Sequence, residues 1–497
     1  MKKQLWSSKW TFILAAIGAA AGLGNLWKFP YLTYNNGGAA FLVAYVICLF
    51  VLAKPIIMTE VAMAQKFKTD VLGSFDKAAG GVGRFFAWLI LGLVIGLGAY
   101  YAGIISWAFN YLYASPTLGW GADAQGYFFN DLLNYKADPA GYGSMSIALL
   151  LGLIATYGAV YLSIFKGVLS VGSVVKWTVP LPFLFLFILF LNSTTLPGAF
   201  EGFKFFLVPQ WEMLTEVSLW KDAITMSFFS TNVGLALTVT YAQYNKEKTD
   251  IVHASWMVGI GDFLVSFVAG LAIFGTLGYM ASLQGVPVTD VVAKSIGLVF
   301  IAIPTGLSQL PFIPQVFAVL FFASIVLLAI DSMFALLETA ISALRLQFGK
   351  LKKMKLEKLV AICCAISLLL SLLFIGENGL TRFDTLDHFL FSHLFYVAIT
   401  AQVIITGWFM PVDELRQYIN SVSKVQLGSW FNVIIKFLAP IVFIGLYVSS
   451  IPKALKENYE GYTDQTILFW GIIPVVLVVL IALFLASKPL TGTTKNK

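Results

Sequence analysis

Four carboxyl groups and one hydroxyl lie inside stretches of sequence that are otherwise apolar: Glu60, Asp262, Asp331, Ser332 and Glu338. A charged side chain at the centre of a bilayer costs at least ~2.5–3.5 kcal/mol, so such residues are candidates for a functional site. Ion pairing is the competing explanation. Lys54 is a candidate partner for Glu60, whereas Asp262 and Asp331 have no nearby basic residue in their own helices.

These side chains offer hard oxygen ligands. The histidines and cysteines follow no metal-ligand spacing, and we interpret them as packing or solvated residues: Cys48, His253, Cys363, Cys364, His388 and His393. Oxygen ligands without His or Cys clusters suit alkali or alkaline-earth cations. Because few carboxylates converge, the pattern favours Na⁺ over Ca²⁺.

The composition identifies the surroundings of these groups as a membrane. Of 497 residues, 59% are hydrophobic and 11% charged, and the mean hydropathy is +0.84. Soluble chains carry about 45–50% apolar and about 25% charged residues. The sequence therefore predicts an all-α polytopic membrane protein and excludes a soluble enzyme.

The net charge of +7 and the pI near 9.0 are explained by membrane topology. Basic residues form short clusters between apolar runs, as at 350–358, with no aromatic-basic groove that follows a phosphate backbone. We therefore expect no nucleic-acid partner.

Apolar runs long enough to cross about 30 Å of hydrocarbon predict twelve transmembrane helices. The first six lie at 11–35, 39–65, 85–113, 146–164, 169–192 and 220–243. The other six lie at 250–282, 308–345, 357–375, 386–410, 430–451 and 466–487.

The distribution of basic residues predicts that both termini are cytoplasmic, in a multi-pass protein of the cell (inner) membrane. This orientation places inside Lys2, Lys3, Lys66, Lys68, Lys77, Arg84, Lys246, Lys248, the 345–358 cluster, Arg416, Lys424 and the Lys495/Lys497 tail. A cleaved signal peptide is the alternative for the first run, but Gly22 to Pro30 continues into Trp and Phe without a normal cleavage region.

Two predicted spans contain residues that interrupt a helix. The first has Gly18, Gly22 and Gly24 around Asn25, and the sixth has small and polar residues over 228–234. Broken helices at corresponding positions of two halves are typical of a transporter site, where free N–H groups face an anion and carbonyls bind a cation. Helix packing is the alternative role for such glycines.

The motifs in this order resemble the neurotransmitter:sodium symporters, in particular their prokaryotic amino-acid transporters. The resemblance covers nearly the whole chain. It rests on Gly22-Leu-Gly-Asn-Leu-Trp-Lys-Phe-Pro30, Asn36-Gly-Gly, Pro55 with Glu60, Tyr100-Tyr101, Leu196-Pro-Gly-Ala199, Trp220, Phe228-Phe229-Ser230 and Asp331-Ser332.

The resemblance implies the leucine-transporter fold and sodium-coupled import of a neutral amino acid, hydrophobic or small, by alternating access. Residues 1–195 would form the first five-helix repeat and 219–410 the second, inverted repeat, within one transporter domain. Residues 411–497 would supply two peripheral helices and a tail. Helices one and six would be broken.

It also implies two Na⁺ sites and one substrate site. One cation would meet the Ala20 carbonyl, Asn25, Ser230, Asp262 and the substrate carboxylate, and the other the carbonyls of Gly18, Ala21 and Leu328 with Asp331 and Ser332. The substrate carboxylate would meet the Leu23 and Gly24 N–H groups and the Tyr101 hydroxyl, and the amine the carbonyls of Ala20, Phe229 and Ser230. The side-chain pocket would comprise Ala19, Leu97, Asn232, Leu235, Ser332 and Leu336.

Gate residues follow from the same resemblance. Lys28 with Asp387, together with Phe229, would close the outer side, although Lys28 lacks the bidentate geometry of the commoner Arg. Lys3 beside Trp6 would close the inner side, but Leu346 replaces the expected acidic partner of Lys3.

Charge counting predicts that chloride is not required. Tyr45, Ser230 and Ser266 match the chloride ligands of the family, but Met226 replaces a Gln and Asp262 brings a carboxylate. The positive charges of two Na⁺ ions cancel the negative charges of Asp262 and Asp331. A bound anion would therefore leave an uncompensated negative charge.

Other functions are weighed against this one. A proton-coupled or sodium-independent exchanger would use Glu60 or Asp262 as proton carrier. A channel needs a continuous polar path and a sensor an output domain, and the sequence indicates neither. No Ser/His, paired-Asp or metal constellation indicates a catalytic site. Membrane lipid and an amino acid are the expected partners, and homo-oligomer formation stays open.

Overall fold

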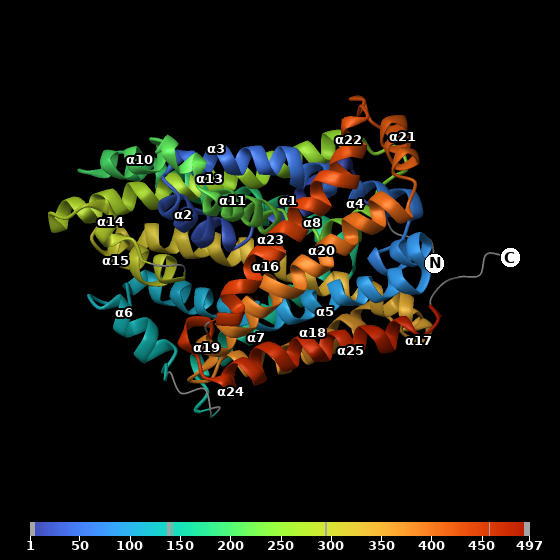
Figure 1. Cartoon of the computed structure of the whole chain (residues 1–497). Coiled ribbons are helices and arrows are strands. Elements are labelled where there is room, and N and C mark those ends of the chain that lie inside the picture. Colours follow the sequence, from blue (N-terminus) through green and yellow to red (C-terminus); the bar gives the residue numbers. More distant parts are fainter. Residues whose placement is uncertain (1–4, 137–140, 142, 294–295, 457, 492–497) are drawn as a thin grey trace.

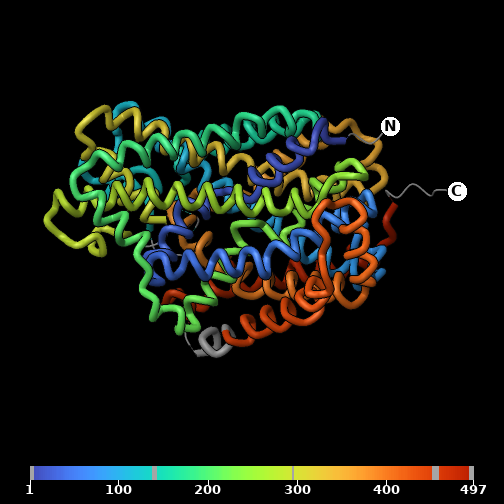
Figure 2. Tube along the Cα trace, turned by 90° about the horizontal axis from the view of Figure 1, so that it is seen from above, coloured from blue at the N-terminus to red at the C-terminus, as the bar shows by residue number. Residues whose placement is uncertain are grey.

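The computed structural model describes residues 5–136, 141, 143–293, 296–456 and 458–491 (Figure 1). Long helices run side by side, and the beginning of α1 and the end of α25 lie at the same end of the bundle (Figures 1 and 2). In the part of the chain described, no residue belongs to a named strand. The predicted all-α fold is confirmed.

Up to residue 193, the described residues form nine α-helices: α1 (Lys9–Ala20), α2 (Gly24–Asn35), α3 (Ala39–Cys48), α4 (Lys54–Phe67), α5 (Val71–Ala114), α6 (Ala124–Gly126), α7 (Ile147–Ile164), α8 (Val168–Thr178) and α9 (Pro180–Ser193). The middle contains α10 (Ala199–Leu207), α11 (Val217–Ser230), α12 (Leu237–Ala242), α13 (Ile251–Gln284), α14 (Val288–Val291), α15 (Ile303–Ser308), α16 (Pro314–Gln347) and α17 (Gly349–Lys353). The last part contains α18 (Leu356–Ser371), α19 (Gly379–Phe389), α20 (Phe395–Ile404), α21 (Val412–Val422), α22 (Trp430–Val433), α23 (Ala439–Lys456), α24 (Asp464–Thr466) and α25 (Ile473–Ala486).

Within the described residues, ten helices are long and apolar enough to cross a membrane, and π-helical turns make several of them continuous. An eleventh span is the pair α1 and α2, which meet at an angle of 56°. The predicted sixth span corresponds to α11 and α12, separated by residues 231–236. The two interruptions therefore lie in the first and sixth predicted spans.

The third span differs from the prediction because its helix begins well before residue 85. The Asp70 carboxylate accepts the Gly73 N–H at 3.1 Å and caps α5 at Val71. The helix then bends at Ala79 and Gly80, and Gly80 takes a φ of +55°, which favours glycine. The apolar run alone marked only the portion after this bend.

Glu377, which lies two residues before the start of α19, joins two loops. Its carboxylate accepts hydrogen bonds from Ser144 at 2.5 Å and Asn134 at 3.1 Å and pairs with Lys136 at 2.9 Å. The hydrogen bond from Ser144, followed by that from Lys136, lowers the pKa of Glu377 to about 2. The Lys136 N–H also donates to the Glu377 carbonyl.

We predict that Glu377→Gln loosens this loop contact at neutral pH. Because the pKa is depressed in the folded state, the wild-type contact is fully present above about 4.5 and is lost as the pH falls toward about 2. The rate of hydrogen exchange at the backbone amides of Lys136 and Glu377 measures how firmly this contact holds the two loops. Faster exchange is expected in Glu377→Gln and not in the exposed control Glu212→Gln; equal protection in both variants would contradict the prediction.

Candidate substrate and sodium site

The break between α1 and α2 is stabilised by side chains that satisfy its free backbone groups. The Asn25 Oδ1 accepts the Gly22 N–H at 3.0 Å, and the Tyr101 hydroxyl accepts the Leu23 N–H at 3.3 Å. All four residues are buried. Since hydrocarbon offers no partner for an N–H group, these bonds make the break stable inside the membrane.

The second break, between α11 and α12, depends on Glu60. Asn232, Gly234 and Ala236 take φ values of +54°, +83° and +62°, which end the helical hydrogen-bond pattern. The Glu60 Oε1 accepts the freed Gly234 N–H at 3.0 Å and the Gln402 side-chain amide at 2.7 Å. Glu60 therefore caps a broken helix.

Lys54, the ion-pair partner considered for Glu60, contacts aromatic rings instead. Its ammonium lies over the rings of Trp256 and Phe50, which stack on each other at 4.8 Å. No ion pair joins Lys54 to Glu60 within 4.0 Å among the residues described.

Direct hydrogen bonds connect the two breaks. The Asn232 side-chain amide donates to the Ala19 carbonyl, which also accepts the Ser332 hydroxyl at 3.1 Å. One carbonyl at the end of α1 thus accepts hydrogen bonds from the α11/α12 break and from α16. A displacement of either broken helix must change this arrangement.

Asp262 is surrounded by donors. Its Oδ1 accepts the Asn25 side-chain amide at 2.7 Å, and its Oδ2 accepts the hydroxyls of Ser230 at 2.6 Å and Tyr45 at 3.0 Å. The Asn25 amide also donates to Ser266 at 2.7 Å. This group of five residues, here called the Asp262 network, is completely buried and joins both breaks to α13 and α3.

Asp331 has the opposite environment. Both of its carboxylate oxygens are buried, and neither forms a hydrogen bond with the described residues. A Cβ added to Gly18 would lie 2.5 Å from the Asp331 Oδ2, so only glycine allows this approach. Leu328 lies one turn earlier on α16, and its carbonyl accepts the Ser332 hydroxyl at 3.4 Å. The Thr178 hydroxyl is the neighbouring donor, and it donates to the Val174 carbonyl at 3.2 Å. A buried carboxylate that accepts no hydrogen bond within 3.5 Å from the described residues, next to Gly18 of α1, has the chemistry of a cation ligand.

A cavity of about 30 Å³ lies between the breaks. It is lined by eleven residues of the predicted substrate and sodium sites: Ala20, Leu23, Gly24, Asn25, Leu97, Tyr101, Phe229, Ser230, Asn232, Ser332 and Leu336. Gly22 and Leu237 complete the lining. Ala19 and Leu235 are not in this lining, and no motif in the sequence predicted Leu237. Ala21 lies in the break itself, where its N–H donates to the Ile17 carbonyl at 2.6 Å.

On the outer side, the expected gate residues have separate partners. The Lys28 ammonium lies 4.4 Å from the centre of the Phe229 ring, and Phe229 packs edge-on against Phe391 at 5.2 Å. Asp387 accepts a hydrogen bond from Tyr100. Within the described ranges, Lys28 and Asp387 are not within 4.0 Å of each other.

On the inner side, Trp6 joins the start of the chain to α12. Its indole N–H donates to the Tyr241 carbonyl at 2.9 Å, and its backbone N–H to the Tyr244 carbonyl at 3.1 Å. Lys3 lies outside the described residues. Sequence reasoning missed these carbonyl partners, because a backbone acceptor leaves no mark in the residue types.

Glu338 follows Asp331 by seven residues on α16 and is also buried. Its Oε2 forms no hydrogen bond within the described part of the chain. It does not line the cavity between the breaks.

The fold and site define a helical membrane protein in which two broken spans meet around buried carboxylates. The model of the sodium:neurotransmitter symporter family matches residues 3–125 and 121–491. The chain belongs to this family, which confirms the resemblance seen in its motifs.

Named relatives agree along the full length. An uncharacterized sodium-dependent transporter of Methanocaldococcus jannaschii is 32% identical over 97% of this chain and 98% of its own length. The sodium- and chloride-dependent taurine transporter of Rattus norvegicus is 31% identical over 97% of this chain and 85% of its own. The sodium- and chloride-dependent GABA transporter 2 of the same species is 31% identical over 95% of this chain and 83% of its own length. These relatives are transporters, not enzymes.

We predict that Glu60→Ala destabilises the folded protein. It leaves the Gly234 N–H and the Gln402 amide without an acceptor, and each unsatisfied buried donor costs about 1–3 kcal/mol. Thermal unfolding of the detergent-solubilised protein measures the loss. Glu60→Gln keeps a side-chain carbonyl oxygen and serves as the control; a Glu60→Ala midpoint no lower than that of Glu60→Gln would disprove the capping role.

Proposed function

We propose that this member of the family is a symporter that imports a neutral amino acid with a small or apolar side chain together with Na⁺, by alternating access. The observation that carries the proposal is the cavity between the two breaks, with the Asp262 network at its edge. Both termini are cytoplasmic in this proposal, as the basic residues between spans favour.

The lining supports a zwitterionic substrate. The α2 helix begins at Gly24, so its N-terminal amides and the Tyr101 hydroxyl suit a carboxylate. Carbonyls of Ala20, Phe229 and Ser230 suit an amine. Leu97, Leu237 and Leu336 offer hydrocarbon to the substrate side chain. The amide of Asn232 already donates to the Ala19 carbonyl, which removes the main polar group from that pocket.

Uptake into proteoliposomes tests this function. We expect saturable uptake of one or more neutral amino acids in sodium medium and little uptake in choline medium. Taurine and GABA, the substrates in the names of relatives, belong in the same screen. Preference for lysine, glutamate, a monoamine or either of these two compounds would overturn the substrate assignment, and uptake in choline driven by a pH gradient would favour the proton-coupled alternative.

Asp331 is proposed as a ligand of one Na⁺, with Ser332 and the carbonyls of Gly18, Ala21 and Leu328. The second Na⁺ would be held by Asp262, Asn25, Ser230 and the Ala20 carbonyl. A bound cation supplies the positive charge that a buried carboxylate needs, and the Asp331 oxygens, which accept no hydrogen bond within 3.5 Å from the described residues, fit this role.

We predict that Asp331→Ala abolishes Na⁺-driven uptake at sodium concentrations that saturate the wild type, with near-normal insertion. We expect no measurable uptake up to at least about tenfold the half-maximal Na⁺ concentration of the wild type, a loss of affinity of more than ~1.4 kcal/mol. Uptake against Na⁺ concentration, with surface amount measured in parallel, is the test. The exposed acid Asp290 provides the control Asp290→Ala, and unchanged Na⁺ dependence of Asp331→Ala would make Asp331 structural.

We also predict transport that does not need chloride, because Asp262 would supply the negative charge. The hydroxyls of Tyr45 and Ser230 both donate to its Oδ2, so the donors that an anion would need are directed at the carboxylate. Relatives are named for dependence on chloride, which makes the comparison informative. Equal uptake in sodium gluconate and sodium chloride is expected, with Asp262→Asn inactive or stimulated by chloride. A wild type that stops in gluconate would refute this.

A further inference from the structure

An apolar groove of about 290 Å³ lies on the outside of the bundle, away from the cavity between the breaks. It is formed by the end of α20, the π-helical turns Ile405–Phe409 and Ile434–Leu438, and the first half of α23. The lining residues are Ile404, Trp408, Lys436, Phe437, Pro440, Ile441 and Ile444. Trp408 and Ile441 are 60% and 66% exposed, so this surface faces lipid.

The two π-helical turns give the groove a defined base. The Trp408 indole N–H donates to the Lys436 carbonyl at 2.9 Å, and its ring meets Phe437 edge-on at 5.6 Å. A Cβ added to Gly407 would lie 3.1 Å from the Ile435 carbonyl oxygen, which shows how closely the turns approach. Because π-helical turns widen a helix and expose carbonyls, this pairing maintains the hollow beside them.

Lys436 is the charged group of this lining. Within the described residues it forms no ion pair. It follows Trp430, the first residue of α22, by six positions, which places it about 9 Å along the helix. In the proposed orientation the span begins at Trp430 on the cytoplasmic side, so a lysine fewer than two turns further along can extend its ammonium back to the headgroups and meet lipid phosphates.

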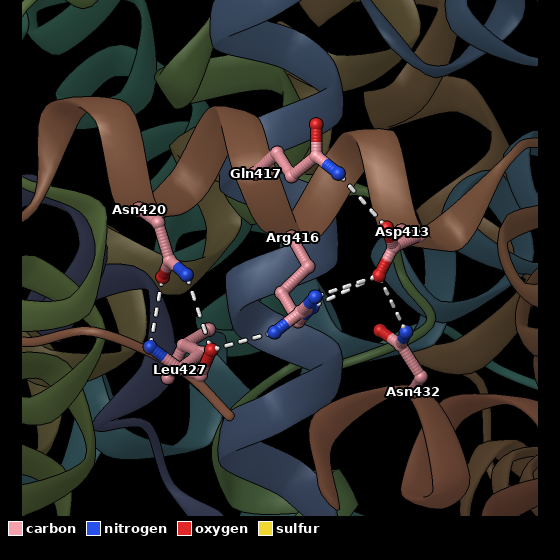
Figure 3. A network of polar contacts seen from close by, with 6 residues as sticks. All are labelled: Asp413, Arg416, Gln417, Asn420, Leu427 and Asn432. Carbon is pink, nitrogen blue, oxygen red and sulfur yellow. Dashed lines mark hydrogen bonds and ion pairs between the residues drawn. The ribbon is translucent and has the colours of Figure 1, made fainter. Parts of the chain in front are cut away.

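The acidic residue near this end of the helix is already engaged. Asp413 accepts hydrogen bonds from Asn432, Arg416 and Gln417, and Asn420 and Arg416 bind the backbone of Leu427 (Figure 3). The bond from Asn432, followed by that from Arg416, lowers the pKa of Asp413, which therefore stays ionised and paired. The network anchors α22 to α21 and leaves the Lys436 charge for an external anion.

We propose that this groove binds one anionic phospholipid, with an acyl chain along Phe437, Ile441 and Ile444 and the phosphate at the Lys436 ammonium. The lined surface itself is hydrocarbon, to which Lys436 contributes its aliphatic stem, and the ammonium at the end of that stem is complementary to a negative headgroup just outside the groove. A neutral lipid or sterol would leave the cation unpaired. The helix α22, which leads into the groove, lies beside α21 at the end of the bundle near both described ends of the chain (Figure 1). In the proposed orientation this is the cytoplasmic leaflet.

Native mass spectrometry of the delipidated full chain tests this site independently of transport. Dioleoylphosphatidylglycerol and dioleoylphosphatidylcholine are added separately in detergent, and the lipids retained per protein are counted. The wild type should retain one phosphatidylglycerol in preference to phosphatidylcholine. Lys436→Gln should weaken phosphatidylglycerol retention about fivefold, since a lysine near an anionic surface contributes ~1 kcal/mol.

Three further variants make the result specific. Lys436→Arg should restore retention, Ile441→Trp should abolish it by filling the groove, and Lys248→Gln, a change at an exposed lysine in another loop, should have no effect. Equal retention of the two lipids, equal effects of Lys436→Gln and Lys248→Gln, or a protein dimer that excludes lipid and is lost in Ile441→Trp would each overturn the proposal.

Discussion

The structure depends on one constraint: a backbone N–H or C=O that leaves a helix inside the membrane must find a partner within the protein. Two spans are broken, and each break has its own polar side chain. Asn25 serves the first by accepting the Gly22 N–H, and Glu60 serves the second by accepting the Gly234 N–H. Without these acceptors, continuous helices would have the lower free energy, and no polar backbone groups would be available between the two spans.

The same bonds determine how the site is assembled. Asn25 uses its oxygen for the break and its amide for Asp262 and Ser266, so one residue connects the unwound backbone to α13. Asn232 connects the second break to the Ala19 carbonyl at the first. Both broken helices are therefore held against each other and against α16. A ligand that enters here changes hydrogen bonds in several spans at once, which is the physical requirement for coupling.

The two buried aspartates differ in the number of hydrogen bonds that their carboxylates accept. Asp262 accepts three hydrogen bonds, which compensate much of the cost of burying its charge. Asp331 accepts none from the described residues and lies against Gly18. We infer that a cation at Asp331 supplies compensation that the protein does not, whereas Asp262 acts as a fixed negative charge within a prepared set of donors.

Residue types and spacing were sufficient to predict the helical class, the positions of the spans and the two interruptions, because each depends on local apolar runs and on glycine or polar residues within them. Partners distant in the sequence were not predictable. Lys54 was a candidate ion-pair partner for Glu60, yet Glu60 binds a backbone amide 174 positions away, and Lys54 lies over Trp256. The predicted gate residue Phe229 does contact Lys28, and Tyr100, which donates to Asp387, was not predicted as a partner there. The apolar run also failed to predict where α5 begins, since Asp70 caps a helical segment that precedes that run.

The central claim is that substrate and Na⁺ bind to one shared site between the breaks. Equilibrium binding to the purified protein tests it most directly: the affinity for the transported amino acid is measured with and without saturating Na⁺, and the affinity for Na⁺ with and without saturating amino acid. Linkage requires the two factors to be equal, and a shared site makes both large. We expect each ligand to raise the affinity for the other by the same factor, of about ten or more. An amino-acid affinity that is the same in sodium and in choline would contradict the account.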